Sequence, residues 1–308
     1  MNAIAIASNQ FPPFPSEYLP GYIARLFNLL ASNNTKQFFS FNSSGTIGKT
    51  DVLVPKVALN FAYLDGALNG GGAFLASHQN ARFWRGFINE DHFKRSLGTI
   101  KASRKSTKRL FDGEEGMASL KPLKWCEECH VEDEDALGVG IWRSIHQVPT
   151  VQRCPIHQCY LKQINLKSPE TLLDYPVING SVIERSIDVY KGHTLEQLDS
   201  WSGTIMSRPS EDTRDWLEGV KSDMSQALHL DLRKASSRNP RLNRDWRDYL
   251  AGNDWLNLPD IKTEQVLRTS NRFTPASLLS GKTSNTHPVI FMLLMNFAKE
   301  YSNFRVQF

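Results

Sequence analysis

The chain has 308 residues and a formal net charge of +4, from 36 Lys and Arg against 32 Asp and Glu. A hydrophobic content of 40% and a charged content of 22% support a folded core and exclude a wholly disordered protein. The length suits one large domain or two to three small ones. No apolar run approaches the roughly 20 residues of a bilayer span, and the start MNAIAIASNQ lacks the features of a signal peptide. The lack of such a run predicts no membrane span. Four cysteines in such a chain indicate a reducing cytosol and no disulfide scaffold.

The N-terminal part predicts a helix after a proline-rich stretch. Prolines keep residues 11–15 extended. Because Pro20 fits only in a first helical turn, the helix starts near Tyr18 to Pro20. Its apolar face has helical spacing and consists of Ile23, Leu26, Phe27 and Leu30. Residues 53–79 predict two further helices joined by a glycine turn, and no Gly-Lys-Ser/Thr follows that would make this turn a phosphate-binding loop.

Charge is segregated along the chain, which the small net charge hides. Residues 81–110 hold nine bases against two acids, with four aromatic residues between them. This segment is either a helix with a core-facing aromatic stripe and a solvated basic face, or a phosphate-binding surface. Its part 101–109 also suits a flexible basic loop. Residues 111–136 are acidic, and residues 233–247 hold six bases against one acid.

The C-terminal part predicts a series of helices. They are expected from about His193, from Asp212 to Leu230, around Trp246, at 262–269 and from Pro288 to about Tyr301. The first of these helices holds Leu195, Leu198 and Trp201, and the short one carries Trp246, Tyr249 and Leu250. In the helix from Asp212 to Leu230, the residues expected to face inward are Trp216, Val220, Met224 and Leu228. The last helix is apolar nearly all round, so it is expected to be buried. Residues 165–192 suit short strands.

All four cysteines lie between Cys126 and Cys159, and three of them form a metal-ligand pattern with a histidine. Cys126 and Cys129 have two residues between them, 24 residues follow, and Cys154 and His157 again have two between them. Each short pair lets one tight turn aim two ligands at one point. The spacing predicts a tetrahedral zinc site with three cysteine ligands and one histidine ligand. Four protein ligands close the shell, so the zinc is expected to be structural rather than catalytic.

Other uses of these residues stay open. The segment from Cys126 to His130 also fits the C-x-x-C-H form of haem attachment, which needs an exported protein and leaves the second pair unexplained. A thioredoxin-like redox pair is a further alternative, but no βαβ pattern surrounds it. Cys159 is left over, either as a small buried residue or as a replacement for His157. His130 competes for the same ligand position.

The segment from Trp142 to Pro149 lies between the two ligand pairs. Its apolar residues are expected to pack against the metal site, with Arg143 and His146 solvated or capping it. Alternatively, Arg143 and His146 reach a phosphate or a partner surface. The acidic residues 127–135 offer carboxylates that a hydrolase or nuclease would need, but a solvated acidic loop is the simpler interpretation.

These residues resemble the TniQ/TnsD family of transposition proteins. The segments WC-x-x-C, W-R-x-x-H-Q-x-P and C-P-x-H-x-x-x-L follow one another as in that family. The matching positions are Trp125, Cys126, Cys129, Gly138, Trp142, Arg143, His146, Gln147, Pro149, Cys154, Pro155, His157 and Leu161. Two distant elements also match, through Glu17, Leu19 and Arg25 at the start and His287, Pro288, Leu293, Leu294 and Phe297 near the end. The resemblance covers about residues 11–165 and 285–300.

The resemblance implies a non-enzymatic function in DNA transposition in a bacterial cytoplasm. Family members select the target site for a heteromeric DDE-type transposon and pass it to the AAA+ ATPase TnsC, which brings in the transposase. TnsD-like members bind double-stranded attachment-site DNA themselves. TniQ-like members dock on a CRISPR effector complex with its guide RNA. The alternatives of other classes are a zinc-dependent hydrolase or nuclease, and a zinc-finger transcription regulator that needs no ATPase partner.

The implied fold is mainly α, with a helix-turn-helix-like domain at 1–110, a zinc knuckle at 111–165 and a C-terminal helical region at 166–308. TnsD-like chains are usually longer and add a C-terminal DNA-binding part, so this chain is expected to be either truncated or a short member. Gln158 stands where the family usually has glycine. The candidate nucleic-acid contacts are Lys94, Arg95, Lys101, Arg104, Lys105, Lys108, Arg109, Arg143, His146, Arg233, Lys234, Arg238, Arg241 and Arg244.

Overall fold

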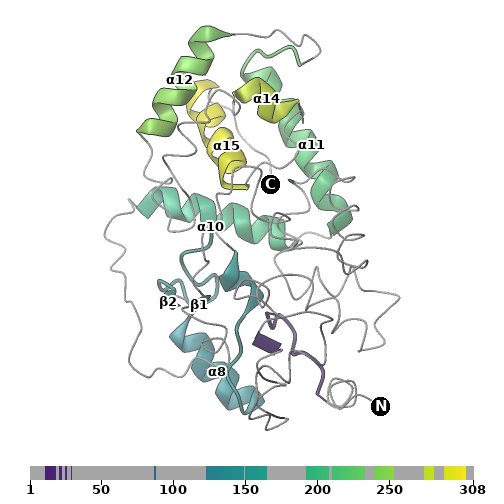
Figure 1. The fold of residues 1–308 in the computed structure, drawn as a ribbon, viewed down its shortest axis with the longest axis vertical. Helices are drawn as coiled ribbons and strands as arrows, with labels where there is room; N and C mark the ends of the chain where they lie inside the picture. Colours follow the sequence, from purple (N-terminus) through teal and green to yellow (C-terminus); the bar gives the residue numbers. More distant parts are fainter. Residues whose placement is uncertain are drawn as a thin grey trace, which may run out of the picture. The chain divides into compact units, whose positions relative to one another are not determined.

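Helices make up most of the secondary structure in the part of the chain that the structure, a computed structural model, describes (Figure 1). The described residues are 11–18, 21, 22, 25, 29, 87, 123–148, 150–164, 192–207, 210–232, 239–252, 274–280 and 288–302. Within them, six α-helices stand beside one two-stranded sheet, so the mainly α fold class is confirmed. None of the described helices combines the length and the apolar character needed to cross a membrane.

The chain divides into two compact units. The first holds the described residues up to Leu29 and those from Leu123 to Ile164, and the second holds Phe87 and the described residues from 192 onward. The helices predicted at 53–79 and 262–269, the strands suggested for 165–192 and nearly all of the basic segment 81–110 lie outside the described residues. The helix-turn-helix-like domain and the three-domain division therefore stay predictions.

Backbone hydrogen bonds fasten the N-terminal segment to the segment between the two ligand pairs. Tyr18 N–H donates to Trp142 O at 2.5 Å, and Ser144 N–H donates to Ser16 O at 2.8 Å. Gly21 lies against the Trp142 side chain so closely that a Cβ atom there would come within 2.8 Å of the indole. A glycine is therefore required for this approach.

The predicted N-terminal helix begins where the prolines place it. Tyr22 N–H donates to Tyr18 O at 3.1 Å, which makes Tyr18 the residue that accepts the first helical hydrogen bond. Arg25 and Leu29 are also helical, and Leu29 is half exposed. The predicted apolar face of this helix lies outside the described residues.

A two-stranded antiparallel sheet joins the two ends of the ligand-bearing stretch. Strand β1 (Leu123–Trp125) pairs with β2 (Lys162–Ile164). The peptide groups of Lys124 instead meet the Gln147 side chain, whose Oε1 accepts from Lys124 N–H at 3.0 Å and whose Nε2 donates to Lys124 O at 2.6 Å. The side-chain amide of Gln147 thus pairs with the N–H and C=O groups of Lys124, as the backbone of a neighbouring strand would. Three-residue strands are too short for a periodic pattern, so the sequence did not predict them.

The acidic residues 127–135 lie in a helix, α8 (Glu127–Leu137), so the expected acidic loop is wrong. Cys126 is the N-cap, and its Sγ accepts from Cys129 N–H. Two glutamates in the first turn suit the positive end of the helix dipole. Gly138 ends the helix in the left-handed conformation, with φ of 74°. Because cysteine is not among the usual N-cap residues, the start of this helix could not be predicted from the sequence.

Helix α15 (Pro288–Ser302) forms the core of the second unit (Figure 1). Every residue from Val289 to Ala298 is buried, which confirms the predicted buried helix. α15 contacts α11 (Ser210–Ala227) and α12 (Pro240–Ala251), and the short α14 (Pro275–Leu279) contacts the same two helices. Phe87 packs edge-on against Phe291, with ring centroids 5.5 Å apart.

The helices α10 (Gly192–Ser207), α11 and α12 lie close to their predicted places. Of the predicted inward residues, Val220, Met224 and Leu228 are buried, and Trp201, Trp246 and Leu250 of the neighbouring helices are buried as well. Trp216 and Tyr249 are only partly buried, and Leu217 is buried beside Trp216. The side chains of Leu195 and Leu198 lie outside the description. α14 was not predicted, because five residues span too little of a helical period.

Candidate metal centre

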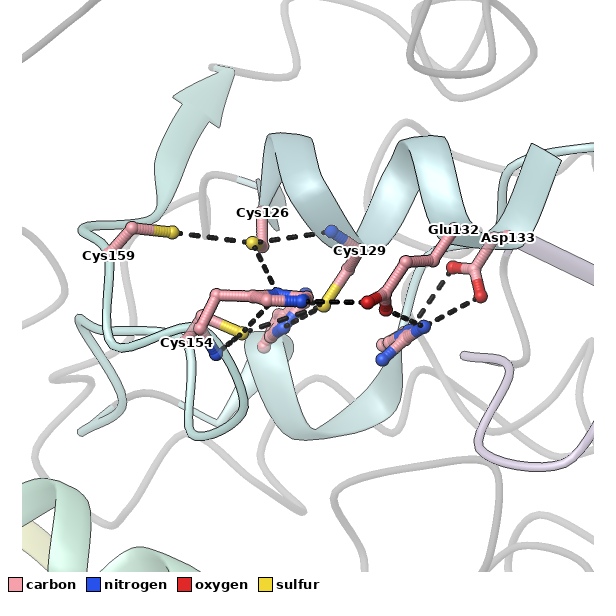
Figure 2. A network of polar contacts seen from close by, with 9 residues as sticks. Cys126, Cys129, Glu132, Asp133, Cys154 and Cys159 are labelled. Atoms are coloured by element: carbon pink, nitrogen blue, oxygen red, sulfur yellow. Dashed lines mark hydrogen bonds and ion pairs between the residues drawn. The ribbon is translucent and has the colours of Figure 1, made fainter. Parts of the chain in front are cut away.

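Four side chains from two short turns meet in the first unit (Figure 2). Cys126 caps α8 and Cys129 lies in its first turn, whereas Cys154 and His157 lie in the turn that precedes β2. One donor atom from each residue lies within 4.8 Å of every other. The three cysteines are buried, and His157 is partly exposed. The structure therefore brings together the two pairs that the spacing predicted, as a possible metal site.

The distances between the donors suit one tetrahedral ion. His157 Nδ1 lies 3.4, 3.3 and 3.7 Å from the sulfur atoms of Cys126, Cys129 and Cys154. Cys129 Sγ lies 3.5 Å from Cys154 Sγ. Zinc bonds of about 2.3 Å to sulfur and about 2.0 Å to nitrogen place neighbouring ligand atoms about 3.5–3.8 Å apart. Three thiolates and one imidazole are also a donor set that closed structural zinc sites use.

Backbone N–H groups point at a sulfur atom in each ligand turn. Cys129 N–H donates to Cys126 Sγ at 3.5 Å, and His157 N–H donates to Cys154 Sγ at 3.4 Å. Hydrogen bonds of this kind favour the charged thiolate over the neutral thiol. Because a metal binds the thiolate form, both turns prepare their cysteines for coordination.

Glu132 holds His157 from outside the four donors. Its Oε1 lies 3.0 Å from His157 Nε2, where the ring N–H donates to the carboxylate (Figure 2). This hydrogen bond raises the pKa of His157 to about 9 in the metal-free chain. A metal that binds Nδ1 must therefore displace a proton at neutral pH. In return, the carboxylate keeps Nε2 protonated and leaves Nδ1 aimed at the sulfur atoms.

The thiols of Cys129 and Cys154 share a hydrogen bond in the metal-free chain. This hydrogen bond raises the pKa of Cys129 and lowers that of Cys154. His146 Nε2 lies 3.9 Å from Cys129 Sγ, and a hydrogen bond from the His146 side chain also lowers the pKa of Cys154. The buried His146 ring is thus placed to stabilise thiolates beside the site.

A family model covers this whole centre. Residues 10–161, about half of the chain, match the model named TniQ. The chain carries a TniQ domain. The matched range includes all four donors and the residues that hold them, and the family recognised from the motifs is confirmed. Neither the curated proteins nor the solved structures compared with the chain gave a match.

The W-R-x-x-H-Q motif of the TniQ domain supports the metal centre from one side. Trp142 is buried edge-on against Trp125, with ring centroids 5.9 Å apart. Arg143 donates from Nε and Nη2 to both carboxylate oxygens of Asp133, at 3.1 and 2.8 Å. This bidentate pair ties the short 3-10 helix η2 (Ser144–Gln147) to α8.

The structure places Arg143 and His146, two of the candidate nucleic-acid contacts, inside the domain. His146 is 1% exposed. The Arg143 side chain is 14% exposed, and its Nη2 also lies 3.7 Å from Glu132 Oε2. Their polar groups face sulfur atoms and carboxylates, so support of the metal centre accounts for both positions. Contact with a nucleic acid gains no support from this arrangement.

The residues of the opening motif of the TniQ domain contact the segment that supports the metal centre. Glu17 is buried, and its carboxylate accepts two hydrogen bonds from the Arg25 guanidinium, at 3.0 and 2.8 Å. The backbone of Glu17 pairs with that of Arg143 as an isolated antiparallel bridge. Residues that are far apart in the sequence and match the family therefore hold one structural centre together.

Gln158 adopts the conformation that the usual glycine would take, with φ of 58°. A side chain in this left-handed region costs roughly 1–2 kcal/mol. Two hydrogen bonds offset part of this cost, from Gln158 Nε2 to Pro155 O at 2.9 Å and from Arg153 Nη2 to Gln158 Oε1 at 2.8 Å. The departure from the family pattern thus leaves the turn and its ligands in place.

Two of the remaining candidate nucleic-acid contacts fall within the described residues. Arg241 and Arg244 are exposed on α12, and the neighbouring Arg247, which was not among the candidates, is exposed as well. The others, at positions 94–109 and 233–238, lie outside the described residues. Their role in binding stays a prediction.

Lys124 is a buried cation that sequence reasoning missed. It is 2% exposed, and its Nζ donates to Val148 O at 2.7 Å and to Val151 O at 2.6 Å. The lysine thus joins β1 to the segment between the ligand pairs. Its acceptors lie 24 and 27 positions further along the chain, so no local pattern could reveal them. The supporting carboxylates Glu132 and Asp133 were missed for the same reason.

Proposed function

We propose that this chain is a non-catalytic adaptor that selects the target site for DNA transposition. The TniQ domain at residues 10–161 is the observation that carries the proposal. In this role the chain binds attachment-site DNA and recruits the AAA+ regulator TnsC, which then brings in the transposase. The alternative within the same role is docking on a CRISPR effector complex, whose guide RNA would read the target instead.

The proposal includes a structural Zn²⁺ bound by Cys126, Cys129, Cys154 and His157. The donor chemistry and the separations of 3.3–3.7 Å between His157 Nδ1 and the three sulfur atoms support this metal. The ion would supply a cross-link between α8 and the turn before β2. A closed shell of four protein ligands fits such a cross-link better than hydrolysis, which needs an open position for water.

Exposed bases support direct contact with nucleic acid. Arg241 and Arg244 protrude from α12 in the described part of the second unit, and the flanking segment 233–238 adds three more bases. Lysine and arginine that meet phosphates supply the sequence-independent part of the affinity for DNA, and each contact steepens its salt dependence.

Salt titration of DNA binding tests the direct mode. The full chain is mixed with duplexes from the chromosomal junctions of the transposon and with shuffled duplexes of equal length. We expect selective binding, and the double variant Arg241→Ala/Arg244→Ala should lower the slope of log K against log salt by about 2. Lys299→Ala, which removes one exposed charge from α15, is the control and should leave selectivity intact. Absence of selectivity without an effector complex favours the CRISPR-docking mode.

Recruitment of the ATPase tests the role as a whole. The tagged chain is incubated with TnsC from the same transposon and a nucleotide, with and without DNA. We expect TnsC to be retained, and retention should need the folded TniQ domain. A chain that binds DNA selectively but never retains TnsC would instead act as a transcription regulator, which contradicts the proposal.

A further inference from the structure

Cys159, the cysteine outside the four predicted ligands, lies at the edge of the metal centre. Its Sγ is 3.3 Å from Cys126 Sγ, and the two sulfur atoms point toward each other (Figure 2). Cys159 belongs to the same turn as His157, because Cys154 N–H donates to Cys159 O at 2.8 Å and closes that turn. The turn that carries Cys154 and His157 therefore also carries Cys159 as a fifth potential donor.

The sulfur atoms of Cys126 and Cys159 are close enough together for both to bind one metal ion. Two thiolates on one tetrahedral zinc lie about 3.8 Å apart, so a small outward shift from the present 3.3 Å would let Cys159 bind the same metal as Cys126. Cys159 is nevertheless absent from the group of mutually close donors, which contains His157 instead. It touches the centre at one corner and is only partly buried.

His157 is the ligand most easily replaced. It is the one partly exposed member of the four, and it is held from outside by Glu132, whose side chain is 55% exposed. The three cysteines are buried, and two of their sulfur atoms accept backbone hydrogen bonds. A ligand at the open side of the cluster can leave without disturbing the buried thiolates.

We infer that Cys159 is a reserve ligand that replaces His157, so that the centre exchanges between coordination by three thiolates with one imidazole and coordination by four thiolates. This inference rests on the proposed zinc site. Zinc accepts thiolate as readily as imidazole. The resting form keeps His157, because a fourth thiolate would add negative charge near the carboxylates in the first turn of α8. Loss of His157 removes the competitor and lets the turn bring Cys159 to the ion.

Metal binding by four forms of the full chain tests this inference: the wild type, His157→Ala, Cys159→Ser and the double variant. Zinc per chain and the zinc dissociation constant are measured by competition with a chelator, and Co²⁺ substitution reports the number of thiolates. We expect His157→Ala to keep one metal per chain with a stronger thiolate-to-cobalt band. The double variant should bind zinc at least about tenfold more weakly than His157→Ala, because a lost ligand costs more than the 10–100-fold of a lost outer partner. Cys159→Ser should match the wild type.

Three results would overturn the inference in distinguishable ways. Equal affinities of His157→Ala and the double variant mean that Cys159 is a partly buried thiol without a role as a ligand. A weaker cobalt band in Cys159→Ser alone means that Cys159 is a permanent ligand and that no exchange occurs. A wild type that binds no zinc contradicts the proposed zinc site itself, and the inference falls with it.

Discussion

Single residues around the metal centre decide how firmly its ligands are held. Glu132 is the clearest case, because it contacts the exposed ligand His157 and also lies near Arg143. A carboxylate behind a metal-bound histidine fixes the ring tautomer and its orientation. The Glu132 side chain is 55% exposed, so solvent weakens this hydrogen bond, and its effect belongs at the low end of the usual range.

Replacement of Glu132 by Gln should weaken zinc binding by about tenfold. Glutamine keeps the shape but loses the charge that holds Nε2–H, so His157 Nδ1 is less well aimed. The dissociation constant is measured by chelator competition on the full chain. Asp135→Asn makes the same change at an exposed position of α8 and serves as the control. An unchanged affinity for Glu132→Gln would show that the sulfur atoms alone position the ring.

At the scale of elements, α8 organises the first unit. Cys126, Cys129 and Glu132 follow one another at intervals of three, so they share one face of the helix. That face receives His157 from the second ligand turn, while the adjacent Asp133 receives Arg143, the N-cap of η2. The acidic composition that first pointed to a loop therefore provides the carboxylates that bind two other segments.

Replacement of Arg143 by Lys tests this organisation. Lysine keeps the charge but loses the two-pronged hydrogen bond to Asp133, so the zinc-loaded chain should lose about 1–2 kcal/mol of stability. Urea unfolding followed by circular dichroism measures the loss. Arg247→Lys on the exposed surface of α12 is the matched control and should change nothing. If Arg143→Lys leaves stability unchanged and weakens DNA binding instead, Arg143 contacts phosphate.

At the scale of the whole molecule, the two units have different sources of stability. The first has a small core around Trp125 and Trp142 and a candidate metal centre whose four donors come from two of its segments. The second buries ten consecutive residues of α15 and draws on the hydrophobic effect, and it contains none of the four metal donors. Removal of the metal should therefore act on one unit.

Chelation of zinc should unfold the first unit and spare the second. Metal-binding energy is folding energy when a site forms only in the native state. Hydrogen exchange followed by mass spectrometry should show loss of protection in β1 and α8 and retained protection in α15. Added zinc should restore the lost protection. Simultaneous loss in both units would mean that they unfold as one cooperative body.

Short-range patterns predicted much of this protein. The spacing of Cys126, Cys129, Cys154 and His157 identified the candidate ligands, because two intervening residues suffice to turn a chain onto one ion. Helical periodicity located α11, α12 and α15, because the spacing of apolar residues along a helix shows which of its faces is buried. The motifs of the TniQ domain were recognisable for the same local reason.

Only the tertiary structure decided what the other motif residues do. From the sequence alone, Arg143 and His146 could either contact a phosphate or a partner surface or support the protein's own fold. In the structure, Arg143 pairs with Asp133 and His146 lies buried beside the sulfur atoms, so both residues support the fold. Lys124 and Cys159 depend likewise on partners more than 20 positions away. Burial and pairing arise from the approach of distant segments. The sequence itself therefore determined the candidate ligands and the helices, and the fold determined which charged groups face inward.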